Sequence, residues 1–335
     1  MYRDNQQILT HDEHRFILNH GALGDMITSL PALVHARIST APVMKMRVYV
    51  APWQVDLVAH LLKPYGEFSV HPMTDVPLNH QKRLEVWGNG VPNSVNAAVH
   101  NTHTRNRVHM VDYAFHFLID AHPDNMAQRS YPVLAPLGMR VLKDKYVVFP
   151  VGATSENKLF RGSVMSPILK WVAERGLTPV LVGTKVSHTR AEMGDGTVSD
   201  ILKIIDQADL VPAETLALCK DMREKTTLLE LRDLLGHAAA VVGVDGGTLH
   251  LAGTTDVPIV YGMGATLPKH RYIARFGDYN HKIRYVVPRN LECAGCQSQW
   301  MMTRWDFREC VYGDSKCMEM LHPLDFIDGL KELGL

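Results

Sequence analysis

Apolar and polar residues follow two patterns along the chain. Short continuous apolar runs, bounded by glycine, proline or polar residues, predict strands that are buried on both faces. Longer stretches in which apolar residues recur every three or four positions predict amphipathic helices. The predicted strands cover 15–20, 44–51, 145–152, 178–184, 239–245, 257–262 and 283–288, and the predicted helices cover 26–38, 53–66, 109–121, 166–176, 227–238 and 322–335.

The alternation of strands and helices predicts an α/β protein with parallel sheets that helices cover on both faces. A polar, proline-containing stretch at 122–144 interrupts the pattern, which restarts after it. The length of 335 residues suits two domains of roughly 150 residues each. We therefore predict two Rossmann-like domains, 1–130 and 131–320, and a C-terminal helix over 321–335. Ligands bind at the carboxyl ends of such strands, so we expect a site in the cleft between the domains.

The charged residues balance, with 35 Lys and Arg against 35 Asp and Glu. This balance argues against a protein that binds nucleic acid or an anionic membrane through its overall charge. Residues 1–15 carry charges where a secretory signal needs an apolar stretch. No run approaches the roughly 18 apolar residues that span a bilayer. We expect a cytoplasmic protein, or one peripheral at the inner face of the membrane, whose cysteines stay reduced.

A glycine-rich turn, Gly-Ala-Leu-Gly-Asp at 21–25, joins the first predicted strand to the first predicted helix. Gly21 and Gly24 permit tight backbone geometry and close approach of a ligand. Asp25 stands at the entrance of the helix. Its carboxylate suits a helix N-cap, and it equally suits a base that removes a proton from an acceptor hydroxyl.

Two later loops carry groups that suit a phosphate. In the segment 244–253 two glycines separate a strand from a helix, where backbone N–H groups and the helix dipole favour an anion. Asp245 is expected to order this loop, and His250 either contacts a phosphate oxygen or packs on the helix. The loop after the strand 145–152 offers Thr154 and Lys158, which suit a diphosphate leaving group or a solvated surface loop equally well.

Four of the five cysteines crowd into the last quarter of the chain, namely Cys293, Cys296, Cys310 and Cys317. Four thiolates can wrap one tetrahedral metal ion, with zinc as the default and iron as the alternative. The spacing is irregular, and four reduced, partly buried thiols explain it as well. A metal site of this kind would be structural.

Taken together, these segments resemble glycosyltransferase family 9, the heptosyltransferase-like enzymes of bacterial glycan assembly. Gly-Ala-Leu-Gly-Asp-Met-Ile-Thr-Ser-Leu-Pro-Ala-Leu at 21–33 is similar to the opening motif of that family. Val-Asp-Gly-Gly-Thr-Leu-His-Leu-Ala-Gly at 244–253 is similar to its second signature. The cysteine-containing segment 293–318 resembles the tail of many members, whereas 55–105 matches no known motif.

The resemblance implies a GT-B fold, with acceptor contacts mainly in the N-terminal domain and the nucleotide-sugar donor mainly in the second domain. It implies an inverting, metal-independent transfer that requires no cofactor, typically from ADP-heptose. Asp25 matches the catalytic base, and Lys158 matches a basic residue on the donor diphosphate. The positions that we assign to the donor are Gly24, Thr154, Lys158, Glu230, Asp245, Gly246, Gly247, Thr248 and His250.

This sequence departs from the family pattern at two donor positions. Gly246 replaces the usual threonine, which removes a hydroxyl that could touch a phosphate. The acidic residue that holds the donor ribose in the family falls at Leu229 in the matching register, with Glu230 beside it. Both departures leave the identity of the donor open.

The sequence leaves the acceptor open among a lipopolysaccharide-like glycan, a protein hydroxyl and a modified nucleic acid, and it leaves the oligomeric state unknown. One competing interpretation is a donor-only epimerase or hydrolase, which would consume the donor without an acceptor. Another is an inactive module of the same fold that binds nucleotide-sugar or nucleic acid.

Overall fold

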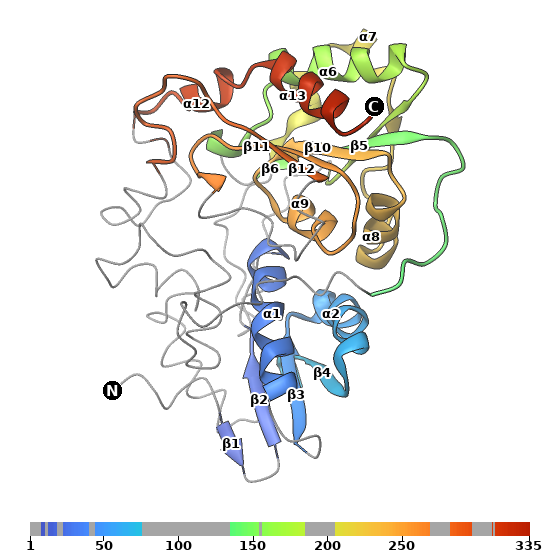
Figure 1. Cartoon of the computed structure of the whole chain (residues 1–335), viewed down its shortest axis with the longest axis vertical. Helices are drawn as coiled ribbons and strands as arrows, with labels where there is room; N and C mark the ends of the chain where they lie inside the picture. Colours follow the sequence, from blue (N-terminus) through green and yellow to red (C-terminus); the bar gives the residue numbers. More distant parts are fainter. Residues whose placement is uncertain are drawn as a thin grey trace. The chain divides into compact units, whose positions relative to one another are not determined.

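The computed structural model describes residues 8–10, 13–18, 23–39, 44–75, 135–153, 156–184, 205–268, 282–296, 310 and 312–335. The predicted helix at 109–121 and Thr154 lie outside these residues. The described chain divides into two compact units, one ending at Pro136 and the other beginning at Leu137 (Figure 1).

The first unit contains a four-stranded sheet and two helices. Its strands lie in the order β1 (Ile8–Thr10), β2 (Glu13–Ile17), β3 (Lys45–Val50) and β4 (Phe68–Pro72). All neighbours are parallel except β1, which is antiparallel to β2. Helices α1 (Leu23–Ser39) and α2 (Val55–Leu62) each follow a strand, and short 3-10 turns lie at Pro52–Gln54, Lys63–Tyr65 and Met73–Asp75. The predicted strands and helices of this region are confirmed.

The second unit is built on a six-stranded parallel sheet. Its strands are β5 (Tyr146–Pro150), β7 (Thr178–Val182), β9 (Lys220–Asp221), β10 (Ala240–Val244), β11 (Ile259–Gly262) and β12 (Ile283–Val286). They lie in the order β12-β11-β10-β5-β7-β9. Numbered along the chain, this is the order 3-2-1-4-5-6 of a Rossmann sheet. A two-stranded antiparallel ladder of β6 (Gly152–Ala153) and β8 (Ile205–Asp206) accompanies it.

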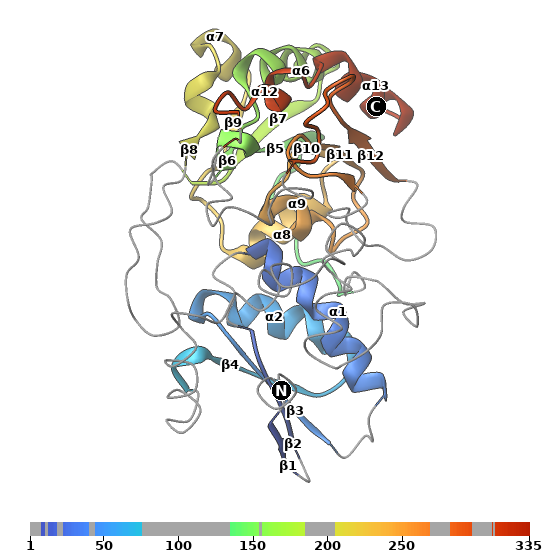
Figure 2. The ribbon, with the colours of Figure 1, turned by 90° about the vertical axis from the view of Figure 1, so that its left-hand side faces the viewer.

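Helices cover both faces of this sheet, as Figures 1 and 2 show. On one face lie α6 (Gly162–Glu174) and α13 (Pro323–Glu332), and on the other lie α8 (Leu228–Gly236) and α9 (Gly247–Ala252). The shorter elements are the 3-10 turns η6 (Glu156–Lys158) and η7 (Gln207–Leu210), α7 (Ala213–Leu216) and α12 (Lys316–Glu319). The three layers enclose the core predicted by the apolar strands.

Helix α13 illustrates how sequence pattern becomes packing. Phe326, Ile327 and Leu330 are buried, as their helical spacing predicts, and they join one apolar cluster with α6 and the sheet. Phe160 and Phe326 pack with ring centroids 5.1 Å apart. The C-terminal helix is therefore part of the second unit and completes its core.

Within the described residues, no helix is both long and apolar enough to cross a membrane.

Candidate functional site

The candidate site lies where the Rossmann order of the second unit reverses, between β5 and β10. The chain leaves β5 toward β7 on one side, and it enters β11 from β10 on the other. Ligands of open parallel sheets bind at the carboxyl ends of the strands at this switch point. Lys158, in η6 after β5, and Asp245, directly after β10, both lie there.

Lys158 and Asp245 form an ion pair at this point. The distance from Nζ to Oδ2 is 3.0 Å, and the side chains are 29% and 7% exposed. Because Asp245 is almost fully buried, this pair is screened less by salt than a surface pair would be. The two residues that the sequence assigned to separate loops are thus brought together.

Asp245 also accepts hydrogen bonds from two neighbours that the sequence analysis did not single out. The Tyr261 hydroxyl donates to Oδ1 at 2.5 Å, and the Thr266 hydroxyl donates to Oδ2 at 3.4 Å. His250 Nε2 lies 3.7 Å from Oδ1, and its ring meets the Tyr261 ring edge-on. His250 is buried beside Asp245, and its assignment to the donor stays a prediction.

A small surface pocket lies beside this ion pair. It is lined by Asn157, Lys158, Asp245, Gly262, Gly264, Ala265, Thr266 and Met318. Met318 comes from α12, so the cysteine-rich C-terminal segment forms part of the pocket wall. Gly264 makes this approach possible, because a Cβ there would meet Met318 Sδ at 2.8 Å and Cys317 Sγ at 2.9 Å.

The Lys158 turn is held in place by Gln207, whose side chain is buried. Gln207 Nε2 donates to the Lys158 carbonyl at 3.3 Å, and its Oε1 accepts from the Phe160 N–H at 3.1 Å. Gln207 N–H also donates to the Val151 carbonyl at 2.8 Å. These bonds tie the turn that carries Lys158 to the end of β5.

Gly246 is the N-cap of α9 and has extended backbone angles, with φ −175° and ψ 162°. A Cβ at this position would meet one neighbouring atom, the Val244 carbonyl oxygen, at an ordinary distance of 3.7 Å. The backbone therefore accommodates the threonine that the family usually has. Gly247 and Thr248 follow as the first residues of α9.

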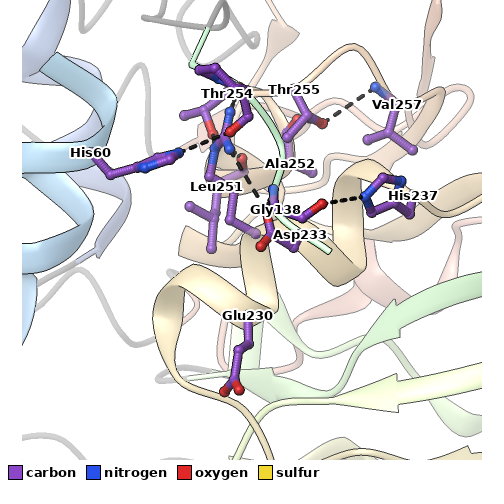
Figure 3. A network of polar contacts seen from close by, with 12 residues as sticks. His60, Gly138, Glu230, Asp233, His237, Leu251, Ala252, Thr254, Thr255 and Val257 are labelled. Atoms are coloured by element: carbon purple, nitrogen blue, oxygen red, sulfur yellow. Dashed lines mark hydrogen bonds and ion pairs between the residues drawn. The ribbon is translucent and has the colours of Figure 1, made fainter. Parts of the chain in front are cut away.

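Helix α9 is locked to α8 by Arg232, which is fully buried. Its Nε donates to Thr254 Oγ1 at 3.1 Å, and its NH2 group donates to the Thr254 carbonyl at 3.0 Å. Burial lowers the pKa of this guanidinium. Asp233 accepts from the Gly138 N–H at 2.8 Å in the same network (Figure 3). The helix that carries the second signature is thereby anchored.

Glu230 lies in α8 but takes no part in the polar network of Arg232 and Asp233, and Figure 3 shows it apart from that network. It forms a capping box with Thr227: its Oε2 accepts from the Thr227 N–H at 2.8 Å, and the Glu230 N–H donates to Thr227 Oγ1 at 3.3 Å. These bonds lower the pKa of Glu230. The structure does not bring Glu230 into the group around Asp245, so its assignment to the donor stays a prediction.

Asp25 is the third residue of α1, following Leu23 and Gly24. It therefore lies inside the first turn of the helix, beyond the N-cap position that one interpretation of the sequence gave it. The position of its side chain lies outside the described part of the structure, and its role as a base stays a prediction.

The four clustered cysteines do not assemble the predicted metal site. Burial, with smaller contributions from Cys296, Cys310 and Cys293, raises the pKa of Cys317 to about 12. Yet the described residues, which include all four cysteines, hold no group of three or more His, Cys, Asp or Glu side chains positioned for a metal ion. The thiols are neighbours without converging on one point, so the structure does not support the metal site. Cys219 stands apart, with its pKa raised to about 11 mainly by burial.

A family model described as glycosyltransferase family 9 (heptosyltransferase) matches residues 108–301, more than half of the chain. The chain belongs to glycosyltransferase family 9. It is accordingly a glycosyltransferase. A search of curated protein sequences found no match.

Solved heptosyltransferases share the GT-B fold of this family 9 chain. TibC, the iron-containing dodecameric glycosyltransferase of enterotoxigenic E. coli H10407, is 16% identical with a TM-score of 0.66, over 98% of this chain and 76% of TibC. The E. coli ADP-heptose lipopolysaccharide heptosyltransferase II is 16% identical with a TM-score of 0.61, over 96% and 98% of the two chains. E. coli WaaC with ADP is 15% identical with a TM-score of 0.55, over 96% and 99%.

Sequence reasoning missed Asn157, Gln207, Tyr261 and Thr266. Tyr261 lies in an apolar strand, where a tyrosine normally signals core packing. Gln207 and Thr266 belong to segments with no motif of their own. Asn157 could have been found from the sequence, because it directly precedes Lys158 in a loop that was already assigned to a diphosphate.

Proposed function

We propose that this glycosyltransferase transfers a heptose-type sugar from an ADP-linked donor to an acceptor hydroxyl with inversion at the anomeric carbon. The observation that carries the proposal is the Lys158–Asp245 ion pair at the switch point of the second unit. Support for the donor comes from relatives of the same fold, since TibC has been solved in complex with ADP-D-β-D-heptose and WaaC with ADP.

Lys158 is the group that stabilises the leaving nucleoside diphosphate. An ammonium carries three N–H donors, so Lys158 can hold Asp245 and a phosphate oxygen at the same time. Negative charge develops on the diphosphate as the anomeric C–O bond breaks. A cation already oriented by a buried carboxylate stabilises that charge without reorganisation. Gly246, Gly247, Thr248 and Thr154 contribute further donors to the phosphates.

Asp25 acts as the general base in this proposal. It accepts the proton of the acceptor hydroxyl as the oxygen attacks the face opposite the leaving group, which inverts the configuration. The acceptor is a hydroxyl of a bacterial glycan, a protein or a modified nucleic acid. Replacement of Asp25 by Asn should lower turnover by roughly 100-fold or more, on the usual scale of general base catalysis, and should leave donor binding intact.

A thermal-shift panel of ADP, UDP, GDP and their sugar conjugates tests the donor. We expect stabilisation by ADP compounds, which amounts to about 2.7 kcal/mol at a concentration of 100 times Kd. The Lys158→Met variant should lose this response. Lys282→Met is the matched control, because Lys282 forms an exposed pair with Asp256 at 3.1 Å outside the pocket lining.

Three outcomes would contradict the proposal. No response of the wild-type protein to any nucleotide would remove the transferase assignment of the pocket. Consumption of the donor at the same rate with and without acceptors would favour a donor-only hydrolase or epimerase. Full turnover by Asp25→Asn would remove Asp25 from the role of base.

A further inference from the structure

We propose that Tyr261 is the positioning residue of the donor site: its hydroxyl holds the Asp245 carboxylate so that Asp245 orients Lys158. The inference rests on the proposed function, because it assumes that Lys158 binds the donor diphosphate. Nothing in the two motifs points to Tyr261, which lies in β11, the strand beside β10.

The partners of Asp245 divide between its two oxygens. Oδ1 faces the Tyr261 hydroxyl at 2.5 Å, and Oδ2 faces Lys158 Nζ at 3.0 Å. A carboxylate held at one oxygen can still rotate about its Cβ–Cγ bond, whereas one held at both oxygens has a defined plane. Tyr261 therefore fixes the plane in which the other oxygen meets Lys158, and Thr266 supports that oxygen more weakly at 3.4 Å.

Tyr261 is suited to this task because its own ring cannot move freely. It is fully buried, its ring meets His250 edge-on, and it packs against Tyr285 with centroids 5.7 Å apart. A hydrogen bond between two buried groups is stronger than the same bond in water. The bond from Tyr261 is thus a fixed support for the carboxylate.

A second buried tyrosine shows what a purely structural hydroxyl looks like in this sheet. Tyr146, in β5, is equally buried, and its hydroxyl donates to the backbone carbonyl of Leu234 at 2.8 Å. That bond ties β5 to α8 and touches no residue of the pocket lining. Tyr261 instead directs its hydroxyl to the acidic residue of the pocket. The pair of tyrosines provides a matched comparison.

The test compares Tyr261→Phe with Tyr146→Phe in the full chain. Each substitution removes one buried hydroxyl and keeps the ring, so both should lower the melting temperature. We expect Tyr261→Phe to weaken ADP binding, measured by calorimetry, by about tenfold to a hundredfold, the range for a hydrogen bond to a charged group. It should raise KM for the donor and leave KM for the acceptor unchanged. Tyr146→Phe should bind ADP within about twofold of wild type.

Asp245→Asn determines whether Tyr261 acts through Asp245. If it does, adding Tyr261→Phe to Asp245→Asn should lower ADP affinity little further. Both substitutions would weaken ADP binding in the same way, through the orientation of Lys158 by Asp245. The inference would be overturned if the fold-losses of ADP affinity from Tyr261→Phe and Asp245→Asn multiply in the double variant. It would also be overturned if Tyr261→Phe and Tyr146→Phe lose the same ADP affinity. So would ADP binding by Tyr261→Phe equal to wild type. These results differ from failure of the proposed function, in which the wild-type protein itself binds none of ADP, UDP and GDP.

Discussion

At the scale of single residues, the site is organised around Asp245. The loop sequence predicts that Asp245 orders its loop, and in the structure Asp245 contacts residues from three other segments. One buried carboxylate joins Lys158 from the β5 loop, Tyr261 from β11 and Thr266 from the segment after it. Because this carboxylate is buried, replacing Lys158 would remove the cation that compensates its charge.

The first residue-scale prediction concerns Gly246. Because its backbone is extended and a Cβ meets nothing closer than 3.7 Å, Gly246→Thr should fold normally. The added hydroxyl should strengthen ADP binding by about twofold to tenfold, the worth of one hydrogen bond. Titration calorimetry measures the effect. Gly264→Ala is the opposite case, since its Cβ would press on Met318 and Cys317, and it should weaken binding. Weaker binding by Gly246→Thr would contradict the prediction.

The second residue-scale prediction concerns the reactivity of the four clustered cysteines. In reduced protein at pH 8, iodoacetamide should modify Cys293 and Cys310, which are half-exposed, well before Cys296 and Cys317, which are buried. With a pKa of about 12, only about one Cys317 in ten thousand is a thiolate at that pH. Peptide mass spectrometry gives the order of labelling. If all four thiols resist until a chelator is added, a bound metal holds them, and the structural reading of this segment is wrong.

At the scale of elements, α9 carries part of the second signature, and α8 packs beside it. Arg232 anchors the end of α9, and the Thr227–Glu230 capping box begins α8. A threonine three residues before a glutamate is a sequence signal for a helix start, so the structure explains Glu230 by local capping. An acidic residue beside the family position can serve the helix alone.

The capping box predicts a pH dependence. The Thr227 bonds lower the pKa of Glu230 below its ordinary value of 4.5. A lowered folded-state pKa contributes stability that is present above the ordinary value and is lost as the pH falls through the lowered one. Glu230→Gln keeps the box without the charge, so its stability deficit relative to wild type should shrink as the pH falls below 4.5. Urea unfolding at several pH values measures this.

Two variants distinguish a capping role of Glu230 from a donor-binding role. Thr227→Ala should lose about 1 kcal/mol near neutral pH, because it removes the cap itself. If Glu230 only caps α8, Glu230→Gln should bind ADP like wild type. A large loss of ADP affinity with an unchanged melting temperature would instead support the ribose-binding role that the family resemblance implies.

At the scale of the whole molecule, donor binding should slow amide hydrogen exchange in one part of the second unit. Amide hydrogen exchange of the full chain with ADP should show protection in η6, at Asp245 and within 262–266, which contribute to the pocket lining. Exchange in α13, on the other face of the sheet, should change little. Lys158→Met should abolish the protection. Protection that is greatest in α13 would place the nucleotide elsewhere.

Much of the described fold could be predicted from the sequence because the signals are local. The strand β10 is an uninterrupted apolar run, α6 ends just before Gly176 with φ +70°, and α13 buries the residues that share its apolar stripe. The elements that were missed, such as β9 and α12, are too short to show a period. Two linked motifs likewise pointed to the family, the second of them contains Asp245, and the family resemblance assigned Lys158.

By itself, therefore, the sequence determined the α/β class, the Rossmann-like pattern, the family and the loops that carry chemistry. The tertiary structure alone decided which side chains meet. It placed the Tyr261 hydroxyl on Asp245, gave Glu230 to a helix cap and kept the four cysteines from converging. The physical reason is that periodicity and motifs report on neighbours along the chain, whereas contacts between β10, β11 and α12 depend on how separate segments pack.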